Sequence, residues 1–454
     1  MRWRLAAVCG GGLALLGGGA ASSLAEAQHP AGDTLELVQV VFRHGARTPL
    51  SQKYWPELVR EWDACGQAYT PVPLDIRTED GQPRPANPDD VKQVETRFLG
   101  GCSKGELTRL GQRQALAFGR WLRRRYVDNL GFLPGDRKQD TLLPRTTNYA
   151  RTVATLAGVL TGLYPGDEGP VPALTTPEMD EVLYANVRSC ARLKELVGGL
   201  HAEARASAKG DEGVQALGRE LAAAMGLPPG HRVSWLNLHD ALTSMQAHDK
   251  PIPEGEMIKR GREVQGYLVG IGPDLLLALD RQAVTSFLHV VAPPHSTGRQ
   301  EEVLRLGMGR MLRMLEEVRR MEETVAGTAR HRMLLYSGHD STLMPLLVAL
   351  GKEVETWPAY MSNLVFENWR RGDGQRYVKV LYNGEALGLQ ELCGTPECPL
   401  QDFRRAVIAP LQLDSATYAE ECVVHPKHTG PAGTRVETRQ RGVSIGSSMQ
   451  EEDE

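Results

Sequence analysis

The sequence lacks the histidine and cysteine spacings that usually hold a metal ion. It has neither an HExxH motif nor paired CxxC motifs, so we expect no metal site. Cys422, His425 and His428 lie close together, but so short a match has low specificity, and we interpret this stretch as part of a solvated tail. Seven cysteines in 454 residues are too few for a disulfide framework, although one or two bridges are compatible with the count.

The chain also lacks a strong net charge and a long apolar run. The formal net charge is -4 at pH 7, so nothing global favours nucleic acid or an anionic membrane surface as a partner. Beyond the N-terminus no apolar run reaches the length of a transmembrane helix, and we expect no stable transmembrane anchor. Any recognition of an anion therefore has to be local.

Both ends of the chain differ from the rest. Residues 1–28 begin with basic residues, continue as a glycine-rich apolar run and hold no acid before Glu26, which predicts a targeting segment. A secretory signal ending near Ala20 fits this pattern, whereas a mitochondrial presequence fits only the arginines and the missing acids. The absence of an Asn-x-Ser/Thr sequon speaks slightly against secretion. Residues 429–454 are polar, end in EEDE and are expected to be a disordered acidic tail.

Between these ends, strands and helices alternate around a long helical block. Apolar runs at 35–42 and 332–338 predict buried strands, and residues 363–384 predict a hairpin. Residues 65–100, rich in Pro, Asp and Gly, predict an extended loop. Helices are expected at 107–127 with Thr108 as N-cap, and at 148–163, 178–290 with breaks, 300–324 and 341–351.

This order predicts an α/β fold with a mostly parallel central sheet flanked by helices and an inserted all-helical cap domain. We expect the core to comprise residues 33–165 and 291–428, and the cap to comprise residues 166–290. The carboxyl ends of parallel strands meet at one edge of such a sheet, and ligands bind there.

Charged residues follow both predicted strands at that edge. In VVFRHGARTPL, residues 40–50, Arg43 and Arg47 flank His44, and His339 and Asp340 follow the second strand. Buried guanidinium groups repel each other, so an anion from outside the chain should neutralise them, and their planar donors match phosphate. The sequence therefore predicts a small-molecule phosphomonoester as the ligand.

These residue types suit phosphoryl transfer. A neutral imidazole, here His44, is a competent nucleophile near neutral pH, and the carboxyl group of Asp340 could protonate the leaving oxygen. A third positive charge could come from either Arg145 or Arg151 in LLPRTTNYARTVATL, because either could point at the cleft. The other two His-Asp dipeptides, at 239–240 and 248–249, fall in a helical stretch and are interpreted as surface or capping residues.

RHGARTP resembles the RHGxRxP signature of the histidine acid phosphatases, the second branch of the histidine phosphatase superfamily. LTRLGQRQ, PRTTNYARTVATL and SGHDSTL resemble three further family motifs, and the resemblance covers residues 35–425. It implies a metal-independent and cofactor-free phosphatase with the histidine phosphatase fold. It also implies that His44 forms a phosphohistidine and that Asp340 donates the proton. By the same resemblance, Arg145 is structural, and the groups that bind the phosphoryl group are Arg43, Arg47, Arg151 and His339.

Finer features resemble one kind of family member. VQVVFRHGAR, LYSGHD, the WP at 357–358 and CPLQDF are similar to a monomeric mitochondrial phosphatase that hydrolyses lysophosphatidic acid to monoacylglycerol and phosphate. The resemblance therefore implies a lysophospholipid substrate, a monomer, a mitochondrial location and a disulfide between Cys393 and Cys398.

Four alternatives stay open. They are a broad acid phosphatase acting on small or sugar phosphates, a phosphomutase, a non-catalytic protein that binds phospholigands, and a location in the secretory pathway.

Overall fold

A computed structural model describes the chain from residue 32 to residue 424 with six gaps. The described residues are 32–51, 61–138, 140–228, 230–250, 271–324, 331–395 and 397–424. The predicted targeting segment and acidic tail lie outside these residues. No helix in the described ranges is long and apolar enough to cross a membrane.

One mixed sheet forms the centre of the described structure. Its strand order is β2-β4-β3-β5-β1-β6-β7-β8, and β9 pairs with β7. The strands from β2 to β1 in this order pair in parallel, whereas β6 and β7 extend the sheet as the predicted antiparallel hairpin. The strands are β1 (Thr34–Arg43), β2 (Leu74–Arg77), β3 (Leu142–Thr146), β4 (Val171–Leu174), β5 (Met333–Gly338), β6 (Asn363–Arg370), β7 (Arg376–Tyr382), β8 (Glu385–Ala386) and β9 (Cys398–Pro399).

Helices cover both faces of this sheet, which explains the nearly continuous apolar run of β1. Val38, Val40 and Phe42 point to the face packed by α3 (Arg109–Arg123) and α4 (Ala150–Leu163). Leu37 and Val41 point to the other face, packed by α9 (Gln300–Thr324) and α10 (Asp340–Ala349). A strand with both faces buried needs apolar residues at every position. The α/β class and the flanking helices are as predicted.

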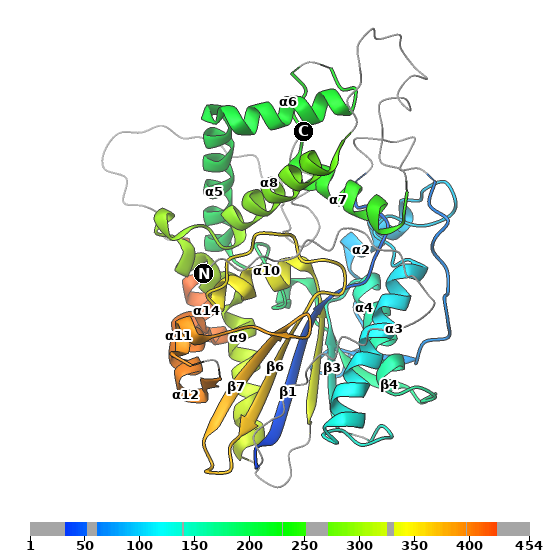
Figure 1. The fold of residues 1–454 in the computed structure, drawn as a ribbon, viewed down its shortest axis with the longest axis vertical. Helices are drawn as coiled ribbons and strands as arrows, with labels where there is room; N and C mark the ends of the chain where they lie inside the picture. The colour runs from blue at the N-terminus through cyan, green and yellow to red at the C-terminus, as the bar shows by residue number, and fades with distance from the viewer. Residues whose placement is uncertain are drawn as a thin grey trace, which may run out of the picture.

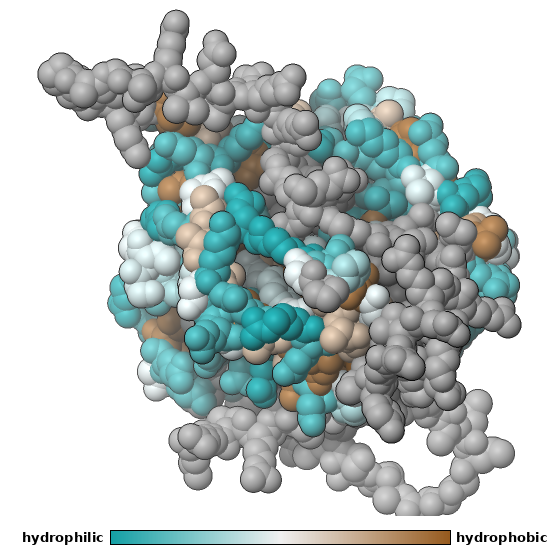
Figure 2. All heavy atoms as spheres, turned by 90° about the horizontal axis from the view of Figure 1, so that it is seen from above, coloured by the Kyte–Doolittle hydropathy of each residue, from teal (hydrophilic) through white to brown (hydrophobic). Residues whose placement is uncertain are grey.

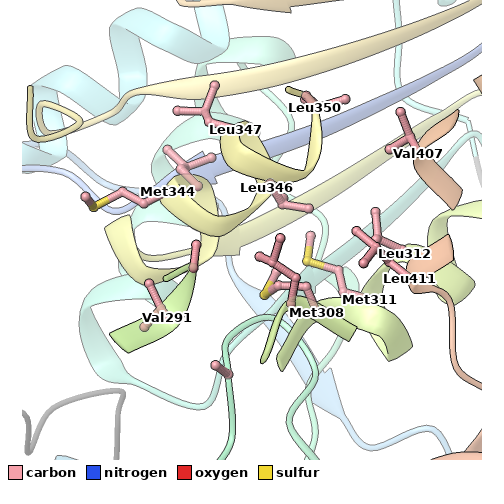
Figure 3. Close-up of a cluster of buried hydrophobic side chains, with 14 of the residues drawn as sticks. Val291, Met308, Met311, Leu312, Met344, Leu346, Leu347, Leu350, Val407 and Leu411 are labelled. Carbon is pink, nitrogen blue, oxygen red and sulfur yellow. The ribbon is translucent and has the colours of Figure 1, made fainter. Parts of the chain in front are cut away.

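The packing of α10 fixes where its first residue, Asp340, lies. Leu346, Leu347 and Leu350 face the sheet and the buried side chains of α9, among them Met308 and Met311 in Figure 3. Since almost every side chain of α10 is buried, the helix has little freedom to shift.

Four long helices lie beyond the carboxyl ends of the parallel strands (Figure 1). They are α5 (Ala191–Gly210), α6 (Glu212–Ala224), α7 (Trp235–Ala247) and α8 (Pro273–Val291). Buried residues of α6 and α7, such as Leu221 and Leu242, pack with Trp62 and Phe98 in a core of their own. The insertion therefore rests directly on the segment that precedes α3.

Two sequence-based boundaries need correction. The predicted cap began at residue 166, but β4 joins the sheet between β2 and β3, so the wholly helical part begins after Leu174. The predicted loop 65–100 contains β2 and α2 (Pro88–Glu95), whose N-cap Asn87 accepts hydrogen bonds from the Asp89 and Asp90 N–H groups. Short elements that carry polar residues give a weak periodic signal, which is why both were missed.

The remaining elements are short. They are η1 (Arg124–Asn129), η2 (Glu178–Asp180), η4 (His295–Thr297), α11 (Gln390–Cys393), α12 (Leu400–Phe403), η5 (Arg404–Ile408), α13 (Ala409–Leu411) and α14 (Ser415–Glu421).

Three disulfides join the cysteines that the structure describes, more than the one or two expected. Cys393–Cys398 is the pair that the family resemblance implied. Cys65–Cys102 closes a loop in the segment before α3. Cys190–Cys422 joins the N-cap of α5 to the C-cap of α14. Because Cys422 forms a disulfide, the prediction that this residue belongs to a solvated tail is wrong.

Candidate active site

β1 and β5 are parallel neighbours that end at the same edge of the sheet. Arg43, the last residue of β1, is in register with Gly338, the last residue of β5. The His44 N–H donates to the Gly338 carbonyl at 3.0 Å. His44 and His339 therefore leave the sheet side by side, with ring centroids 5.6 Å apart. The two strand ends that the sequence placed at one cleft are adjacent in the structure.

The LTRLGQRQ motif holds the loop after β1. Thr108 caps α3 by accepting from the Gly111 N–H, and its hydroxyl donates to the Ala46 carbonyl at 3.1 Å. Gln114 Oε1 accepts from the Ala46 N–H at 2.8 Å. Gly111 allows the approach, because a Cβ at this position would lie 2.1 Å from Ala46 O. The threonine, glycine and glutamine of the motif thus clamp the loop that carries the imidazole.

One hydrogen bond fixes the tautomer of His44. Its Nδ1 lies 2.9 Å from the Gly45 carbonyl, which can only accept, so Nδ1 carries the proton. Nε2 then has the free lone pair. Burial, followed by the nearby arginines with Arg151 first, holds the pKa of His44 well below its usual value. The imidazole is therefore neutral at neutral pH and presents Nε2 as a nucleophile.

Arg43 is held in the site by both terminal nitrogens and by one face of its guanidinium group. Its Nη2 pairs with Asp340 Oδ2 at 2.9 Å, and its Nη1 donates to the Pro358 carbonyl. The guanidinium carbon lies 4.4 Å from the centre of the Tyr360 ring. This geometry fixes the plane of a cation that carries one of the three positive charges expected around the ligand.

Arg47 and Arg151 are held by other parts of the chain. Arg47 Nη2 pairs with Asp240 Oδ1 at 2.7 Å, and Arg151 Nη1 donates to Gln93 Oε1 at 2.9 Å. The guanidinium carbon of Arg151 also lies 4.5 Å from the centre of the Tyr149 ring. Of the two arginines that the sequence left open, Arg151 belongs to this cluster.

Arg145 points elsewhere, as the family resemblance implied. It pairs with Glu79 at 2.6 Å and lies near Thr176 and Glu181. These contacts brace β3 against the segment that follows β4.

Three buried donors in the cluster have no partner in the structure. They are the Nε–H groups of Arg43, Arg47 and Arg151, residues that are 3%, 3% and 2% exposed. A buried donor without an acceptor costs about 1–3 kcal/mol. An oxyanion placed among the three guanidinium groups would satisfy these donors and offset the repulsion between the cations.

Asp340 is the least enclosed member of the cluster, with a side chain 19% exposed. Its Oδ2 accepts from Arg43 Nη2 and, at 2.8 Å, from the Trp357 indole N–H, so both lone pairs of this oxygen are used. Its Oδ1 accepts only from the Ser341 N–H at 2.8 Å. A proton carried by this carboxyl group therefore sits on Oδ1.

The charge of Asp340 follows from two opposing effects. Burial alone would raise its pKa, but Arg43 and the Trp357 N–H outweigh burial and hold the pKa well below its usual value. Asp340 is thus ionised in the unliganded site.

His339 lies between the two motifs. The ring atom Nε2 of His339 is 2.9 Å from Thr147 Oγ1, and the backbone N–H of His339 donates to Thr342 Oγ1 at the start of α10. Tyr149 and Tyr184 pack edge-on against the ring. Burial, then Arg151, holds its pKa well below the ordinary value.

Four residues of this site were not found from the sequence. Asp240, Gln93, Trp357 and Tyr360 each contact one of the predicted residues directly. The interpretation of the dipeptide at 239–240 as surface residues is wrong: Asp240 is 7% exposed and reaches the cluster from α7. Only contacts between residues far apart in the chain reveal these roles.

Two other features are separate from this cluster. Among the described residues, Cys65, Cys102 and Glu106 come close enough to suggest a metal, but the two cysteines form a disulfide. A cavity beside α9 and α10 is lined mainly by apolar side chains such as Leu312 and Phe366, and none of the site residues lines it.

Sequence comparison identifies the family. A family model of the histidine phosphatase superfamily (branch 2) matches residues 34–216 and 299–383, more than half of the chain. The chain belongs to this superfamily. The matched ranges contain all six predicted site residues and leave out most of α6 to α8.

Curated relatives of this superfamily member include several phosphatases. Lysophosphatidic acid phosphatase type 6 from Homo sapiens is 29% identical over 382 residues, which cover 82% of each protein. Testicular acid phosphatase from Homo sapiens is 27% identical and covers 72% of this chain and 75% of its own length. The chain is therefore a phosphomonoesterase of the histidine phosphatase type.

Solved structures agree on the fold. Hafnia alvei phytase in its apo form superposes with a TM-score of 0.57 at 16% identity, over 88% of this chain and all of the phytase. The multiple inositol polyphosphate phosphatase of Bifidobacterium longum in complex with phosphate gives a TM-score of 0.54 at 11% identity, over 87% of this chain and 96% of the neighbour. At such identities the likeness concerns the fold alone.

Proposed function

We propose that this phosphomonoesterase hydrolyses lysophosphatidic acid to monoacylglycerol and phosphate through a phosphohistidine on His44. The observation that carries the chemistry is the geometry around His44: a neutral imidazole with Nε2 free, next to three arginines with unsatisfied Nε–H donors. The lipid substrate is supported by relatives that carry the name lysophosphatidic acid phosphatase type 6 and match 82% of the chain.

In the first half-reaction, His44 Nε2 attacks phosphorus, and the bond to the ester oxygen breaks. Because Asp340 is ionised in the resting site, a proton that enters with the phosphomonoester first moves to its Oδ1, the oxygen that keeps a free lone pair, and the departing alcohol then takes this proton. Arg43, Arg47 and Arg151 stabilise the charge on the equatorial oxygens during transfer. The Nδ1–H bond to the Gly45 carbonyl supports the positive charge that the imidazole gains.

In the second half-reaction, a water molecule attacks the phosphohistidine. Asp340, now ionised, accepts a proton from this water as the new P–O bond forms and the N–P bond breaks. The products are phosphate and neutral His44. Asp340 then gives the proton that it took from water to the departing phosphate, which restores the ionised resting state of the carboxyl group.

Exposed apolar side chains on and near α2 support the binding of an acyl chain. Val91 and Val94 are 46% and 44% exposed on α2, the helix that also holds Arg151 through Gln93. Met179, 51% exposed, lies near the start of this helix, because Arg188 bonds both Glu178 and Asp89. Large exposed apolar side chains that lie near one another are typical of surfaces that bind apolar ligands.

A broad acid phosphatase acting on small phosphomonoesters is the second candidate. Hydrophilic residues predominate around the hollow seen from above in Figure 2. Polar groups such as Ser244 and Tyr360 also lie over the cluster. Such surroundings would accept glycerol phosphate or sugar phosphates.

A phosphate-release panel tests the proposal. It compares lysophosphatidic acids of increasing chain length with glycerol phosphate and a sugar phosphate, using the parent chain, His44→Ala and the double variant Val91→Ser/Val94→Ser. We expect His44→Ala to be inactive on all substrates. The double variant should raise KM for long acyl chains and leave KM for glycerol phosphate unchanged. Equal kcat/KM for glycerol phosphate and lysophosphatidic acid in the parent chain would favour the broad phosphatase.

We further propose that the chain works in an oxidising compartment. Three disulfides join six of its seven cysteines, and such bonds persist mainly outside reducing compartments. This supports the secretory alternative over the mitochondrial expectation. Fluorescent tagging at the C-terminus, with cell fractionation, tests the two. The monomeric state stays a prediction.

A further inference from the structure

A carboxylate of the helical insertion forms an ion pair with one of the arginines proposed to bind phosphate. Asp240 Oδ1 pairs with Arg47 Nη2 at 2.7 Å, and Asp240 Oδ2 accepts from the Leu50 N–H at 2.7 Å. The side chains of the ion pair are 4% and 6% exposed. One turn further along α7, Ser244 bonds the Tyr360 hydroxyl at 3.1 Å. Both carboxylate oxygens are thus fixed in the wall of the site.

Charged and titratable groups face this ion pair from every neighbouring element. They are His44 on the same loop, Arg151 of α4, His339 and Asp340 at the start of α10, Tyr360 of the next loop, His239 of α7 and Asp280 of α8. His239 Nε2 and Asp280 Oδ1 lie 2.8 Å apart and form a hydrogen bond with each other.

The directly bonded groups leave little net positive charge. Arg43, Arg47 and Arg151 supply three positive charges, and Asp240 and Asp340 remove two. The two histidines are neutral at neutral pH, since burial and the arginines lower their pKa values. One net positive charge matches a phosphate group with one negative charge better than a group with two.

We propose that Asp240 is a specificity-determining residue that adapts the site to phosphomonoester monoanions and weakens binding of dianions, including the phosphate product. This inference rests on the proposed phosphatase function of the same site. A phosphomonoester loses its second proton with a pKa of about 6, so the monoanion is the main form only under mildly acidic conditions.

The monoanion also brings the proton that the resting site lacks. Asp340 is ionised, but its Oδ1 has a free lone pair. The proton of the phosphoryl OH group moves to Oδ1 and then to the ester oxygen as the P–O bond breaks and the bond from His44 Nε2 to phosphorus forms. No proton from solvent is needed, and the total charge of the complex does not change.

Binding of inorganic phosphate to the full chain, measured by isothermal titration calorimetry at about pH 5 and about pH 8, tests the proposal on both sides of the second ionisation of phosphate. For the parent chain we expect weaker binding at the higher pH. For Asp240→Asn, which keeps the size of the side chain, we expect phosphate to bind about tenfold more tightly at the higher pH, because a charge next to the anion has gone. For this variant, the difference in phosphate affinity between the two pH values should become smaller.

A matched control removes another buried carboxylate. Glu367→Gln breaks the 2.7 Å ion pair with Arg125, away from the site, and should leave both affinities unchanged. Equal or weaker phosphate binding by Asp240→Asn would overturn the proposal. If this variant does not fold, tighter binding of phosphate at the higher pH by the parent chain would overturn it as well. Because binding is measured without turnover, failure of the proposed function would show separately, as a chain that binds phosphate and releases none from its substrates.

Discussion

A methyl group on Gly111 should move the loop that carries His44. Gly111 lies in the first turn of α3, and its Cα faces the backbone of Ala46. An added Cβ would lie 2.1 Å from Ala46 O and 2.8 Å from Ala46 N. Both contacts are with backbone atoms, which cannot rotate away as a side chain can, so the loop or the helix has to shift by about 1 Å.

Two effects of Gly111→Ala oppose each other. Alanine stabilises a helix by up to about 1 kcal/mol relative to glycine, whereas overpacking of a close contact costs about 1–3 kcal/mol. We expect net destabilisation of about 1–2 kcal/mol. The catalytic effect should be larger, because a misplacement of about 1 Å can lower the rate about 100-fold.

The assay measures kcat for phosphate release and the urea midpoint for the parent chain, Gly111→Ala and a control. Gly198→Ala is the matched control, because Gly198 also lies in a helix, α5, but an added Cβ there meets nothing within 4 Å. This control should be slightly more stable than the parent and equally active. A Gly111→Ala variant with the kcat and the midpoint of the parent chain would refute the reasoning.

Three further perturbations address other parts of the molecule. Asp340→Asn should slow hydrolysis about 100-fold or more for alkyl phosphates and much less for p-nitrophenyl phosphate, whose leaving group needs no proton; equal losses would contradict the role as acid. Because the pKa values of His44 and His339 are lowered in the folded state, the unfolded chain takes up more protons, so the melting temperature should fall as pH drops below about 6.5, and His44→Ala should show a smaller fall. Serine at both Cys190 and Cys422 should cost about 3–5 kcal/mol in urea unfolding, and an unchanged midpoint would exclude a bridge in the folded protein.

The sequence predicted the parts of the site that belong to continuous segments. β1 and β5 each contain an apolar stretch that is followed at once by a polar motif, so their place at one edge of a sheet was predictable without coordinates. Thr108 was likewise predictable as an N-cap, because an acceptor side chain stands just before the apolar spacing of α3.

The parts that depend on contacts between distant segments were not predictable. Asp240 and Arg47 form an ion pair although 193 positions separate them, and no sequence pattern near either residue predicts this pair. α7 carries buried polar residues such as Asn237 and Ser244 among its buried apolar ones, so its periodicity does not show which side faces the site. β4 has only four residues, too few to stand out in the helical stretch around it. The disulfide between Cys190 and Cys422 joins residues 232 positions apart.

The ionised state of Asp340 in the empty site is compatible with its role as an acid, because the ligand changes the balance that sets its pKa. Burial raises this pKa, and Arg43 is the first of the groups that lower it. A phosphoryl group that binds among the arginines adds negative charge next to Asp340 and shares the guanidinium group of Arg43. Both changes weaken the stabilisation of the carboxylate, whereas the effect of burial remains. Substrate binding therefore raises the proton affinity of Oδ1, and departure of phosphate restores the ionised form, so that the charge of the ligand itself switches Asp340 between acid and base.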